Sequence, residues 1–563
     1  MADGPFTQDP PRLGNTYADD AALRDLLRRL LPPDVHRVLE PQWRQLGDEA
    51  AGPLAELARQ AEADPPRHVP FDAWGNRVDR VETCAAWKAL QDAAARWGLY
   101  AVPYEGGLGP HARVHQGALL SLYAPSSAIA SCPLAMTDGA ARTLLEHDPA
   151  LAARLVPRFT ARDPGRLWTC GQWMTERSGG SDVGGTRTVA RRGADGAYRL
   201  WGDKWFTSAV TSEAALTLAR VEGAAEGSAG LSLFFLELRG ADGALNGIRV
   251  ERLKDKLGTR ALPTAELALT GALAVPVGGE GNGVRKVAPL LNTTRLHNSM
   301  NAAATLGRLL QLLRDYARRR VAFGGPLAGK PLHRETLADL QVEYEAALGL
   351  TFECLRLLGR LEAGEASARD KLCLRLLTPV AKLATARQAV AAASEALEGF
   401  GGAGYVEDTG LPVHLRNAQV LSIWEGTTNV LSLDVLRAVG REDALAAWAD
   451  DVRARLAPLA AGPLATSVAP LAPYLEHVLQ WSRAARGEAL EAGARRFALA
   501  VAALASGLAL CEQAAWSLAQ GGPERPAHAA RRWTQSRLPP LPGPDQTDDD
   551  ARARASLSGL DPY

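Results

Sequence analysis

The chain has 563 residues, more than a single compact core usually holds, so we expect about two to four domains. Lys plus Arg and Asp plus Glu both number 63, and this balance gives the whole molecule no attraction towards nucleic acid or an anionic membrane. The sequence has no run of 18 or more uninterrupted apolar residues and no signal-peptide pattern at its start. These features predict a soluble, cytoplasmic protein without a membrane partner.

The cysteines are scattered along the chain and include no CxxC pair. This spacing is typical of reduced thiols and suits neither a disulfide framework nor a zinc site. We therefore expect no bound metal. The cysteines are Cys84, Cys132, Cys170, Cys354, Cys373 and Cys511.

The first part of the chain is predicted to be helical. Residues 1–20 are polar and rich in Pro, Gly and Asp, and we expect an extended or disordered arm there. Over residues 21–164, apolar side chains recur at three- and four-residue spacing, as at Leu23, Leu26 and Leu27. This periodicity predicts an N-terminal helical domain.

The periodicity changes over residues 165–282. Short runs of strand type alternate there with turn residues, such as Gly-Ala-Asp-Gly at 193–196 and again at 240–243. The pattern predicts a compact middle domain that resembles a β-barrel. The predicted strands include 197–201, 215–219, 231–236 and 265–269.

Helical periodicity returns over residues 283–440 and predicts a C-terminal four-helix bundle. Residues 441–540 are again helical and predict a helical C-terminal extension, whereas the Pro- and Asp-rich residues 541–563 predict a flexible tail. The predicted fold class is therefore α+β, mostly α. The long helical patterns of the bundle cover 296–320, 332–362, 371–398 and 415–439.

The most informative segment is Ser-Ile-Trp-Glu-Gly-Thr-Thr-Asn at 422–429, where Glu425 stands between apolar residues and Gly426. A carboxylate with apolar neighbours loses hydration, which raises its pKa towards the range where it exchanges protons with a substrate. Thr427 and Asn429 can hydrogen-bond a polar ligand. The alternative is a Glu at a helix start, where the helix dipole favours negative charge.

Two segments of the β region suit a flat or phosphate-bearing ligand. Residues 174–182 carry two glycines and several hydroxyl groups, which expose backbone N–H groups to a ligand. Residues 202–208 place Trp205 beside Thr207 and Ser208, a combination that fits one face of a flat ring and its polar edge. Taken singly, a turn and a buried strand Trp are the simpler explanations.

Two helix ends carry further candidate residues. Arg320 stands three residues before Phe323 and could bind a pyrophosphate while the Phe packs on an adenine. The alternative is that cations there only complement the helix dipole. Several glycines follow Glu398, and a helix C-cap accounts for one of them but not for three.

These segments in this order resemble the acyl-CoA dehydrogenase flavoprotein superfamily over about residues 20–440, and more weakly beyond. The pattern at 256–267 and the glycine link at 279–283 add to the resemblance. Within the superfamily the chain looks closest to the branch of the alkylation-response protein AidB. The signs are Met-Thr-Glu-x-x-Gly-Gly-Ser-Asp-Val at 174–183, Trp424 and the helical extension.

The resemblance implies FAD bound between the β domain and the bundle. It assigns contacts with that cofactor to Met174, Thr175, Ser181, Trp205, Thr207, Ser208, Trp424, Thr427 and Asn429. It assigns contacts with the FAD of a neighbouring subunit to Arg320, Phe323, Glu398, Gly401 and Gly402, and so implies an obligate oligomer, commonly a homotetramer built as a dimer of dimers. Glu398 departs from the usual Gln, and its charge repels phosphate unless an Arg pairs with it.

The resemblance also makes Glu425 the catalytic base of an oxidoreductase that acts on CH–CH donors. Glu425 would remove the α-proton of an acyl-CoA thioester while a β-hydride passes to the flavin. General-base catalysis of this kind typically contributes about 10²- to 10⁴-fold. Arg295 and Ser181 would lie near the substrate. The sequence leaves the acyl chain and the electron acceptor open.

A second hypothesis, taken from the AidB branch, is a flavin-containing DNA-associated protein of the alkylation response. Binding DNA needs a basic surface. Residues 441–563 contain 13 Arg, no Lys and 14 Asp plus Glu, a net charge of −1. Arg525, Arg531, Arg532 and Arg537 do cluster, but a solvated helix face explains them more simply. A flavin monooxygenase on the same scaffold is a third possibility.

Overall fold

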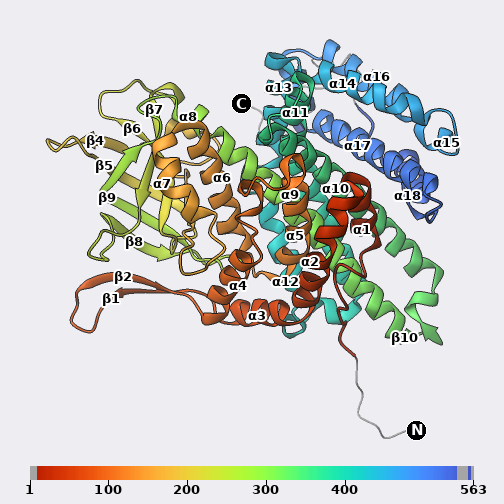
Figure 1. Ribbon diagram of the computed structural model, residues 1–563, viewed down its shortest axis with the longest axis horizontal. Coiled ribbons are helices and arrows are strands. Elements are labelled where there is room, and N and C mark those ends of the chain that lie inside the picture. The colour runs from red at the N-terminus through yellow and green to blue at the C-terminus, as the bar shows by residue number, and fades with distance from the viewer. Residues whose placement is uncertain (1–8, 542–555, 559–563) are drawn as a thin grey trace, which may run out of the picture.

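The computed structural model describes residues 9–541 and 556–558. A β domain lies on one side of the molecule, long helices fill its centre, and a further helical layer covers the opposite side (Figure 1). This arrangement confirms the predicted fold class, mostly helical with a β-barrel-like middle domain. Residues 1–8 of the expected arm, and all of the expected tail except 541 and 556–558, lie outside the described residues.

The N-terminal part is helical, as predicted, but it also contains a β-hairpin that the periodicity did not indicate. In Figure 1 the hairpin extends along the lower side of the β domain. Arg77 anchors it there, because its Nη2 donates to the carbonyl oxygen of Val250 at 2.7 Å. The elements are α1 (Ala21–Leu30), α2 (Pro33–Ala51), α3 (Pro53–Ala63), β1 (Arg67–Phe71), β2 (Arg77–Glu82), α4 (Ala85–Arg96), α5 (Ala112–Tyr123), α6 (Ser131–His147) and α7 (Pro149–Phe159).

The described part of the N-terminal arm contains no helix or strand, forms a turn at residues 16–19 and is bound to the bundle. The backbone N–H of Arg12 donates to Asp315 Oδ2 at 2.7 Å, and Gln311 Nε2 donates to the carbonyl oxygen of Thr16 at 2.8 Å. Polar composition alone did not reveal these contacts, because the partners lie about 300 residues away in the sequence.

The middle strands close on themselves. β6 pairs with β4, and the pairing continues through β5, β9 and β7 back to β6, which leaves β3 and β8 at the margins. Along β6, Leu216 and Leu218 pack against α6 and α7, whereas Ala215 and Ala219 point to the opposite core. The strands are β3 (Cys170–Trp173), β4 (Val189–Arg192), β5 (Tyr198–Ser208), β6 (Ala214–Val221), β7 (Leu231–Glu237), β8 (Ile248–Leu253) and β9 (Thr264–Pro276).

The bundle is built on three helices of 32 residues each, about 48 Å long, that pack against one another. The predicted single helix over 415–439 is wrong at 422–427, where Glu425 and Gly426 have φ of 58° and 103° and break it in two. The elements are α8 (Gly283–Lys286), α9 (Ala288–Arg319), β10 (Val321–Ala322), β11 (Gly325–Pro326), α10 (Pro331–Glu362), α11 (Ala368–Gly399), α12 (Pro412–Leu421) and α13 (Thr428–Glu442).

The C-terminal extension forms the helical layer on the far side of the bundle (Figure 1). Its longest helix, α17, is long and apolar enough to cross a membrane, yet 83% of that apolar window is buried inside the protein. α17 packs on α10, α11 and α13, so it is a core helix. The elements are α14 (Ala444–Leu456), α15 (Ala465–Val468), α16 (Leu471–Ala484), α17 (Gly487–Ala519) and α18 (Arg525–Ser536).

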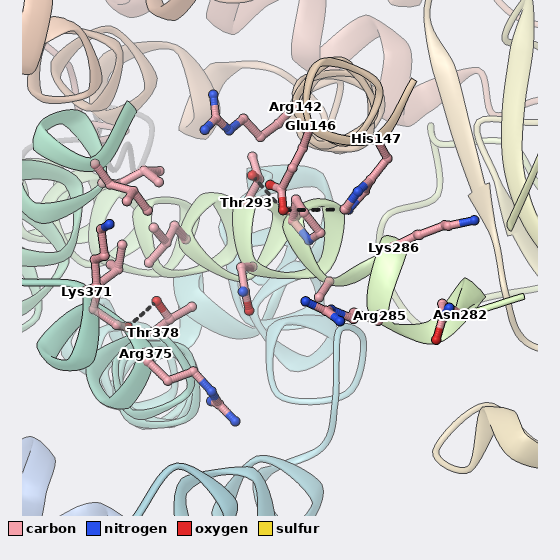
Figure 2. Close-up of a pocket in the computed structure, with 17 residues that line it drawn as sticks. Arg142, Glu146, His147, Asn282, Arg285, Lys286, Thr293, Lys371, Arg375 and Thr378 are labelled. Carbon is pink, nitrogen blue, oxygen red and sulfur yellow. Dashed lines mark hydrogen bonds and ion pairs between the residues drawn. The ribbon is translucent and has the colours of Figure 1, made fainter. Parts of the chain in front are cut away.

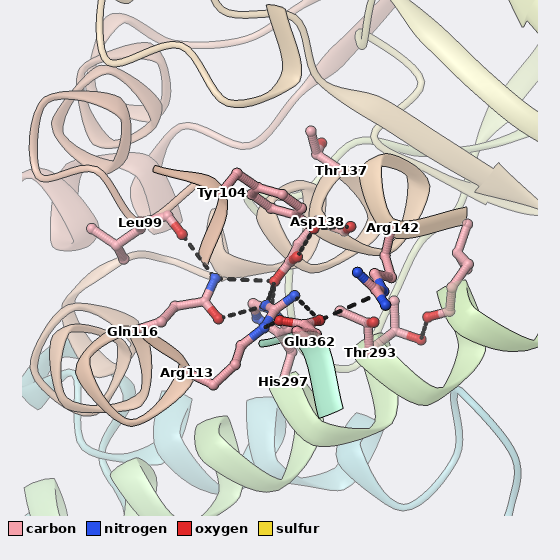
Figure 3. Close-up of polar contacts among 12 residues, drawn as sticks. Leu99, Tyr104, Arg113, Gln116, Thr137, Asp138, Arg142, Thr293, His297 and Glu362 are labelled. Carbon is pink, nitrogen blue, oxygen red and sulfur yellow. Dashed lines mark hydrogen bonds and ion pairs between the residues drawn. The ribbon is translucent and has the colours of Figure 1, made fainter. Parts of the chain in front are cut away.

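A buried charge network joins the N-terminal helices to the bundle (Figure 3). Arg113 on α5 donates to Asp138 on α6 at 2.6 Å and to Glu362 on α10 at 2.7 Å. His297 on α9 lies 2.7 Å from the same Asp138 oxygen. Because the Arg113 and Asp138 side chains are 1% and 0% exposed, each charge depends on the other for its solvation.

Replacing Arg113 by Met should lower the free energy of unfolding at pH 7 by about 3–5 kcal/mol, because the fully buried Asp138 loses the guanidinium that pairs with it. Burial raises the pKa of Asp138, but Arg113 and His297 outweigh it and hold that pKa below its usual value. The carboxylate therefore stabilises the fold above about pH 4, and this contribution is lost as the pH falls lower. Urea unfolding across this pH range measures both effects.

Arg154→Met is the control, because it removes a half-exposed ion pair with Glu237 and should cost about 1 kcal/mol or less. An equal cost for the two variants would contradict the importance of the network.

Candidate active site

Glu425 lies in the turn between α12 and α13 and is half-buried. The hydroxyl of Thr294 on α9 lies 2.8 Å from Glu425 Oε2. On the other side, Gln172 Nε2 of β3 lies 3.3 and 3.2 Å from Oε1 and Oε2. The carboxylate is thus held at the junction of the β domain and the bundle, and its role as the base that faces a cofactor stays a prediction.

Side chains of two bundle helices hold the backbone of this turn in place. Lys382 on α11 donates its ammonium to the carbonyl oxygen of Gly426 at 2.6 Å, and Arg295 Nε lies 3.4 Å from the carbonyl oxygen of Glu425. Lys382 is fully buried, and burial lowers its pKa to about 7, although the charge of Glu425 opposes that shift. The turn is therefore held by two cations that do not touch the carboxylate.

Arg295, a predicted substrate residue, is fixed by a second carboxylate. Its Nη1 donates to Asp434 Oδ2 at 2.8 Å, and Arg375 donates to the other oxygen of Asp434 at 2.9 Å. Burial raises the pKa of Asp434, but the two arginines outweigh it and lower that pKa. Arg295 Nη1 also lies 3.4 Å from Asn292 Oδ1, and Asn292 lines a neighbouring cavity.

This cavity, of about 560 Å³, opens between α6, α8, α9, α10 and α11 (Figure 2). Leucines of α9, α10 and α11 form its apolar part, and cations surround it. Among the described residues, Arg285 and Lys371 of its rim make no ion pair. The cavity thus combines an apolar floor with a mostly cationic rim, and Asn292 of α9 belongs to its wall. The cationic or potentially cationic residues are Arg142, His147, Arg285, Lys286, Lys371 and Arg375, and the acid among them is Glu146.

The predicted residues of β5 lie on the β-domain side of the junction. Trp205 is half-buried, with the Lys254 ammonium 3.4 Å from its ring centroid and the Arg177 guanidinium at 5.2 Å. Thr207 is fully buried and donates its hydroxyl to the carbonyl oxygen of Ala265 at 2.5 Å. The hydroxyl of Ser208 pairs likewise within the sheet. The Thr207 hydroxyl is thus used within the barrel, and its contact with a flavin stays a prediction.

The loop that follows β3 is anchored by a buried ion pair. Lys204 Nζ lies 3.0 Å from Glu176 Oε1, and both side chains are almost completely buried. Met174 packs into the β-domain core, whereas Ser181 is exposed. The carbonyl oxygen of Thr175 accepts the backbone N–H of Trp205 at 2.9 Å, which fixes the loop beside the indole.

The other predicted residues of the turn serve its local structure. Trp424 donates its indole N–H to Asn298 on α9. Thr427 caps α13 by accepting the backbone N–H of Val430, and Asn429 lies 3.5 Å from Arg495 of the extension.

The structure does not bring Arg320, Phe323, Glu398, Gly401 and Gly402 to Glu425. Arg320 follows the last residue of α9, about 38 Å along the helix from Thr294. Phe323 is 92% exposed, and a side chain added at Gly401 or Gly402 would meet nothing within 4 Å. These residues form a separate, open surface.

Sequence reasoning missed three residues that shape the site. Gln172 stands two positions before the Met-Thr-Glu motif, and a lone amide in a buried strand is a usable signal. Lys382 is a single cation within the apolar run of α11, which also marks it. Thr294 carried no signal beyond its place next to Arg295.

The β-domain side fits a flat ring that bears phosphates. Phe206 is 55% exposed beside the half-buried Trp205, and Lys254 and Arg177 supply positive charge there. Gly179 leaves open space where a side chain would stand. A flavin would be held by Trp205 and the exposed loop around Gly179, a donor set compatible with such a group.

A β-barrel set between helical domains, with a carboxylate held at its junction with the bundle, is the arrangement expected of the flavoprotein oxidoreductase class that the sequence resembles. Models of four domains match the chain: the AidB N-terminal domain at 8–164, the acyl-CoA dehydrogenase middle domain at 171–272 and C-terminal domain at 281–440, and an acyl-CoA dehydrogenase 11 C-terminal-like domain at 443–557. The chain belongs to the acyl-CoA dehydrogenase family, and it is an oxidoreductase that acts on CH–CH donors.

The curated relatives include acyl-CoA dehydrogenase family member 11 of Caenorhabditis elegans, 48% identical over 79% of this chain and 74% of that protein. The putative acyl-CoA dehydrogenase AidB of Escherichia coli is 34% identical over 77% of this chain and 79% of that protein. Both matches agree with the predicted superfamily and AidB-like branch.

Solved structures resemble the fold closely. The C. elegans ACDH-11 structure in complex with C11-CoA has a TM-score of 0.95 and 41% identity, and it covers 99% of this chain and 97% of that chain. An acyl-CoA dehydrogenase from Bacillus anthracis, complexed with FAD, has a TM-score of 0.72 and covers 98% of this chain and 93% of that chain; at 18% identity it shows the fold alone.

Gly426→Ala should lower the free energy of unfolding by about 1–2 kcal/mol, because φ is 103° there and a Cβ would press on Leu431 at 3.0 Å. Chemical denaturation measures the change. Gly440→Ala in α13 is the control: its Cβ meets open space, and Ala should stabilise the helix by about 0.5–1 kcal/mol. Equal effects of both changes would show that the turn is not constrained.

Proposed function

We propose that this protein is an FAD-dependent acyl-CoA dehydrogenase in which Glu425 is the catalytic base. The observation that supports this most is the carboxylate itself, held from α9 by Thr294 and from β3 by Gln172 at the junction with the β domain. An ionised carboxylate has about four lone-pair sites. The two donors leave others free to accept a proton from a substrate.

The proposed reaction forms a Cα=Cβ double bond. Glu425 accepts the α-proton, and the hydride leaves Cβ. When bound, FAD supplies the two-electron acceptor for that hydride. The backbone restraints from Lys382 and Arg295 keep Glu425 in one position, which favours the alignment on which such proton transfer depends.

We propose that the cation-lined cavity holds the phosphate-bearing end of the CoA thioester. Arg285 and Lys371 are free to pair with phosphates, and Asn292 connects the cavity to Arg295 and so to Glu425. The crystal structure of the worm relative contains C11-CoA, which supports an acyl-CoA substrate. The length and branching of the acyl chain stay open.

We also propose an obligate oligomer, with a homotetramer as the expected form. Arg320, Phe323, Glu398, Gly401 and Gly402 lie at the far end of α9 and α11 from Glu425, so they can reach a cofactor only in another subunit. A cytoplasmic location is part of the proposal, supported by the free state of all the cysteines in the described part of the chain.

The DNA-associated alternative is less favoured, because three of the four arginines clustered in and after α18 are already paired with acids. Arg525 pairs with Glu345 of α10, Arg532 donates to Asp339 at 2.9 Å, and Arg537 donates to Glu343 at 2.9 Å. Of the four clustered arginines, Arg531 remains exposed without an ion pair in the described chain. Phosphate contacts by this surface would first have to break those pairs.

Glu425→Gln should retain FAD, because the amide keeps the shape of the side chain, but should abolish bleaching of the flavin by acyl-CoAs under anaerobic conditions. Absorbance near the flavin band, recorded in a stopped-flow instrument with a panel of chain lengths, measures this. Bleaching at the wild-type rate would exclude Glu425 as the base. If no thioester bleaches the wild-type flavin and duplex DNA binds with a steep salt dependence, the alternative function holds.

Arg285→Glu combined with Lys371→Glu should raise the Kd for acyl-CoA by about tenfold or more, since two cations that face phosphates are reversed. The affinity for the matching acyl-pantetheine, which lacks the nucleotide, should not change. Arg531→Glu on α18 is the matched control and should alter neither. An equal loss for both ligands would place the nucleotide elsewhere.

A further inference from the structure

Gln172 is a polar side chain in an otherwise buried strand. In β3, its neighbours Gly171 and Trp173 are buried, and Gln172 pairs with Leu216 of β6. Its Nε2 reaches both oxygens of Glu425, whereas its Oε1 is buried with no hydrogen-bond partner among the described residues. A buried amide normally satisfies both ends, so a half-satisfied one needs a physical reason.

The orientation of this amide follows from the charge of its partner. With the amide reversed, Oε1 would stand against the carboxylate oxygens of Glu425, and the N–H groups would face no acceptor. The orientation with Nε2 towards Glu425 therefore suits a carboxylate partner, which accepts hydrogen bonds.

Thr294 cannot replace Gln172 as a donor. Its hydroxyl carries one proton, and three acceptors lie within reach: Glu425 Oε2 at 2.8 Å, the carbonyl oxygen of Leu290 at 3.1 Å and that of Leu291 at 3.0 Å. Hydroxyls inside helices often donate to such carbonyls. The amide of Gln172, in contrast, has no other acceptor in the described chain.

The other charged and titratable groups that the structure describes around Glu425 donate no hydrogen bond to its carboxylate. Lys382 of α11 and Arg295 of α9 bind backbone carbonyl oxygens of the turn. Cys132 of α6 stays a neutral thiol, because burial, with a smaller contribution from the charge of Glu425, raises its pKa to about 12. Among the described residues, hydrogen bonds to the carboxylate come from Gln172 and Thr294 alone.

We propose that Gln172 is the positioning residue that holds the carboxylate of Glu425 and directs it across the junction; this inference rests on the proposed function, in which Glu425 is the base. The strand supplies a donor that does not itself titrate, and it joins the carboxylate to the β domain on which the flavin would lie. Gln172 acts through Glu425 and takes no proton.

Gln172→Met, close in volume and without hydrogen-bonding groups, tests the inference. The rate constant for flavin reduction by acyl-CoA is measured from pH 5 to 9 on the FAD-loaded protein. Loss of a hydrogen bond to the charged form should move the acidic limb of the profile to higher pH by about one unit. Relative to the wild type, the rate constant of Gln172→Met should therefore fall less at pH values above the acidic limb than at pH values within or below it.

A second readout does not depend on turnover. Infrared difference spectra between acidic and neutral pH show the carboxylate band of Glu425, identified by its absence in Glu425→Gln. In Gln172→Met, the midpoint pH at which this band appears should shift by the same amount as the acidic limb of the rate profile. Gln388→Met is the matched control, because Gln388 donates to Glu343 at 2.9 Å away from the site, and it should shift neither signal.

An unchanged limb together with an unchanged band in Gln172→Met would overturn the inference. Gln172→Asn, whose shorter side chain withdraws the donor, is measured in the same way and decides the question if the Met variant does not fold. If the wild-type flavin is not reduced by any acyl-CoA, the proposed function fails, while the infrared titration still decides whether Gln172 holds Glu425.

Discussion

The carboxylate of Glu425 is hydrogen-bonded from two parts of the fold, the bundle and the β domain. One hydrophobic core joins the N-terminal helices, the bundle and the extension, a second packs α6, α7 and the start of α9 against the barrel, and a third fills the barrel. Where these parts meet at Glu425, the contact is polar and directional, with Thr294 on one side and Gln172 on the other. The site depends on the relative placement of these parts, so the network of Arg113, which fixes the N-terminal helices to the bundle, supports it from a distance.

Much of the fold follows from the sequence, because helical and strand periodicities are local properties of the chain. The long helices, the change to strands after residue 165 and the apolar extension were all visible in this way. The hairpin β1–β2 was not, because its strands are short, contain one buried residue between them and lack apolar alternation. The break at 422–427 was missed for another reason: a positive φ at Glu425 leaves no trace in periodicity.

The candidate site was only partly predictable. Glu425 and Trp205 could be found by their chemical neighbours, and the resemblance to a family supplied the rest. The direction of a side chain could not be predicted from the sequence. Thr207 is an example, since its hydroxyl donates to the carbonyl oxygen of Ala265 in the neighbouring strand. Gln172 and Lys382 contact the turn from elements remote in sequence, and only the tertiary structure brings them together.

The ion pairs between α18 and α10 affect how the protein responds to salt. Arg532 and Arg537 are bound to Asp339 and Glu343 at half-exposed positions, where dissolved ions compete for both partners. The apolar contacts of α17 have no such sensitivity. Concentrated salt should therefore weaken these ion pairs but leave the buried packing of Trp533 on α17 intact, so one face of α18 is fastened by charge and the other by exclusion of water.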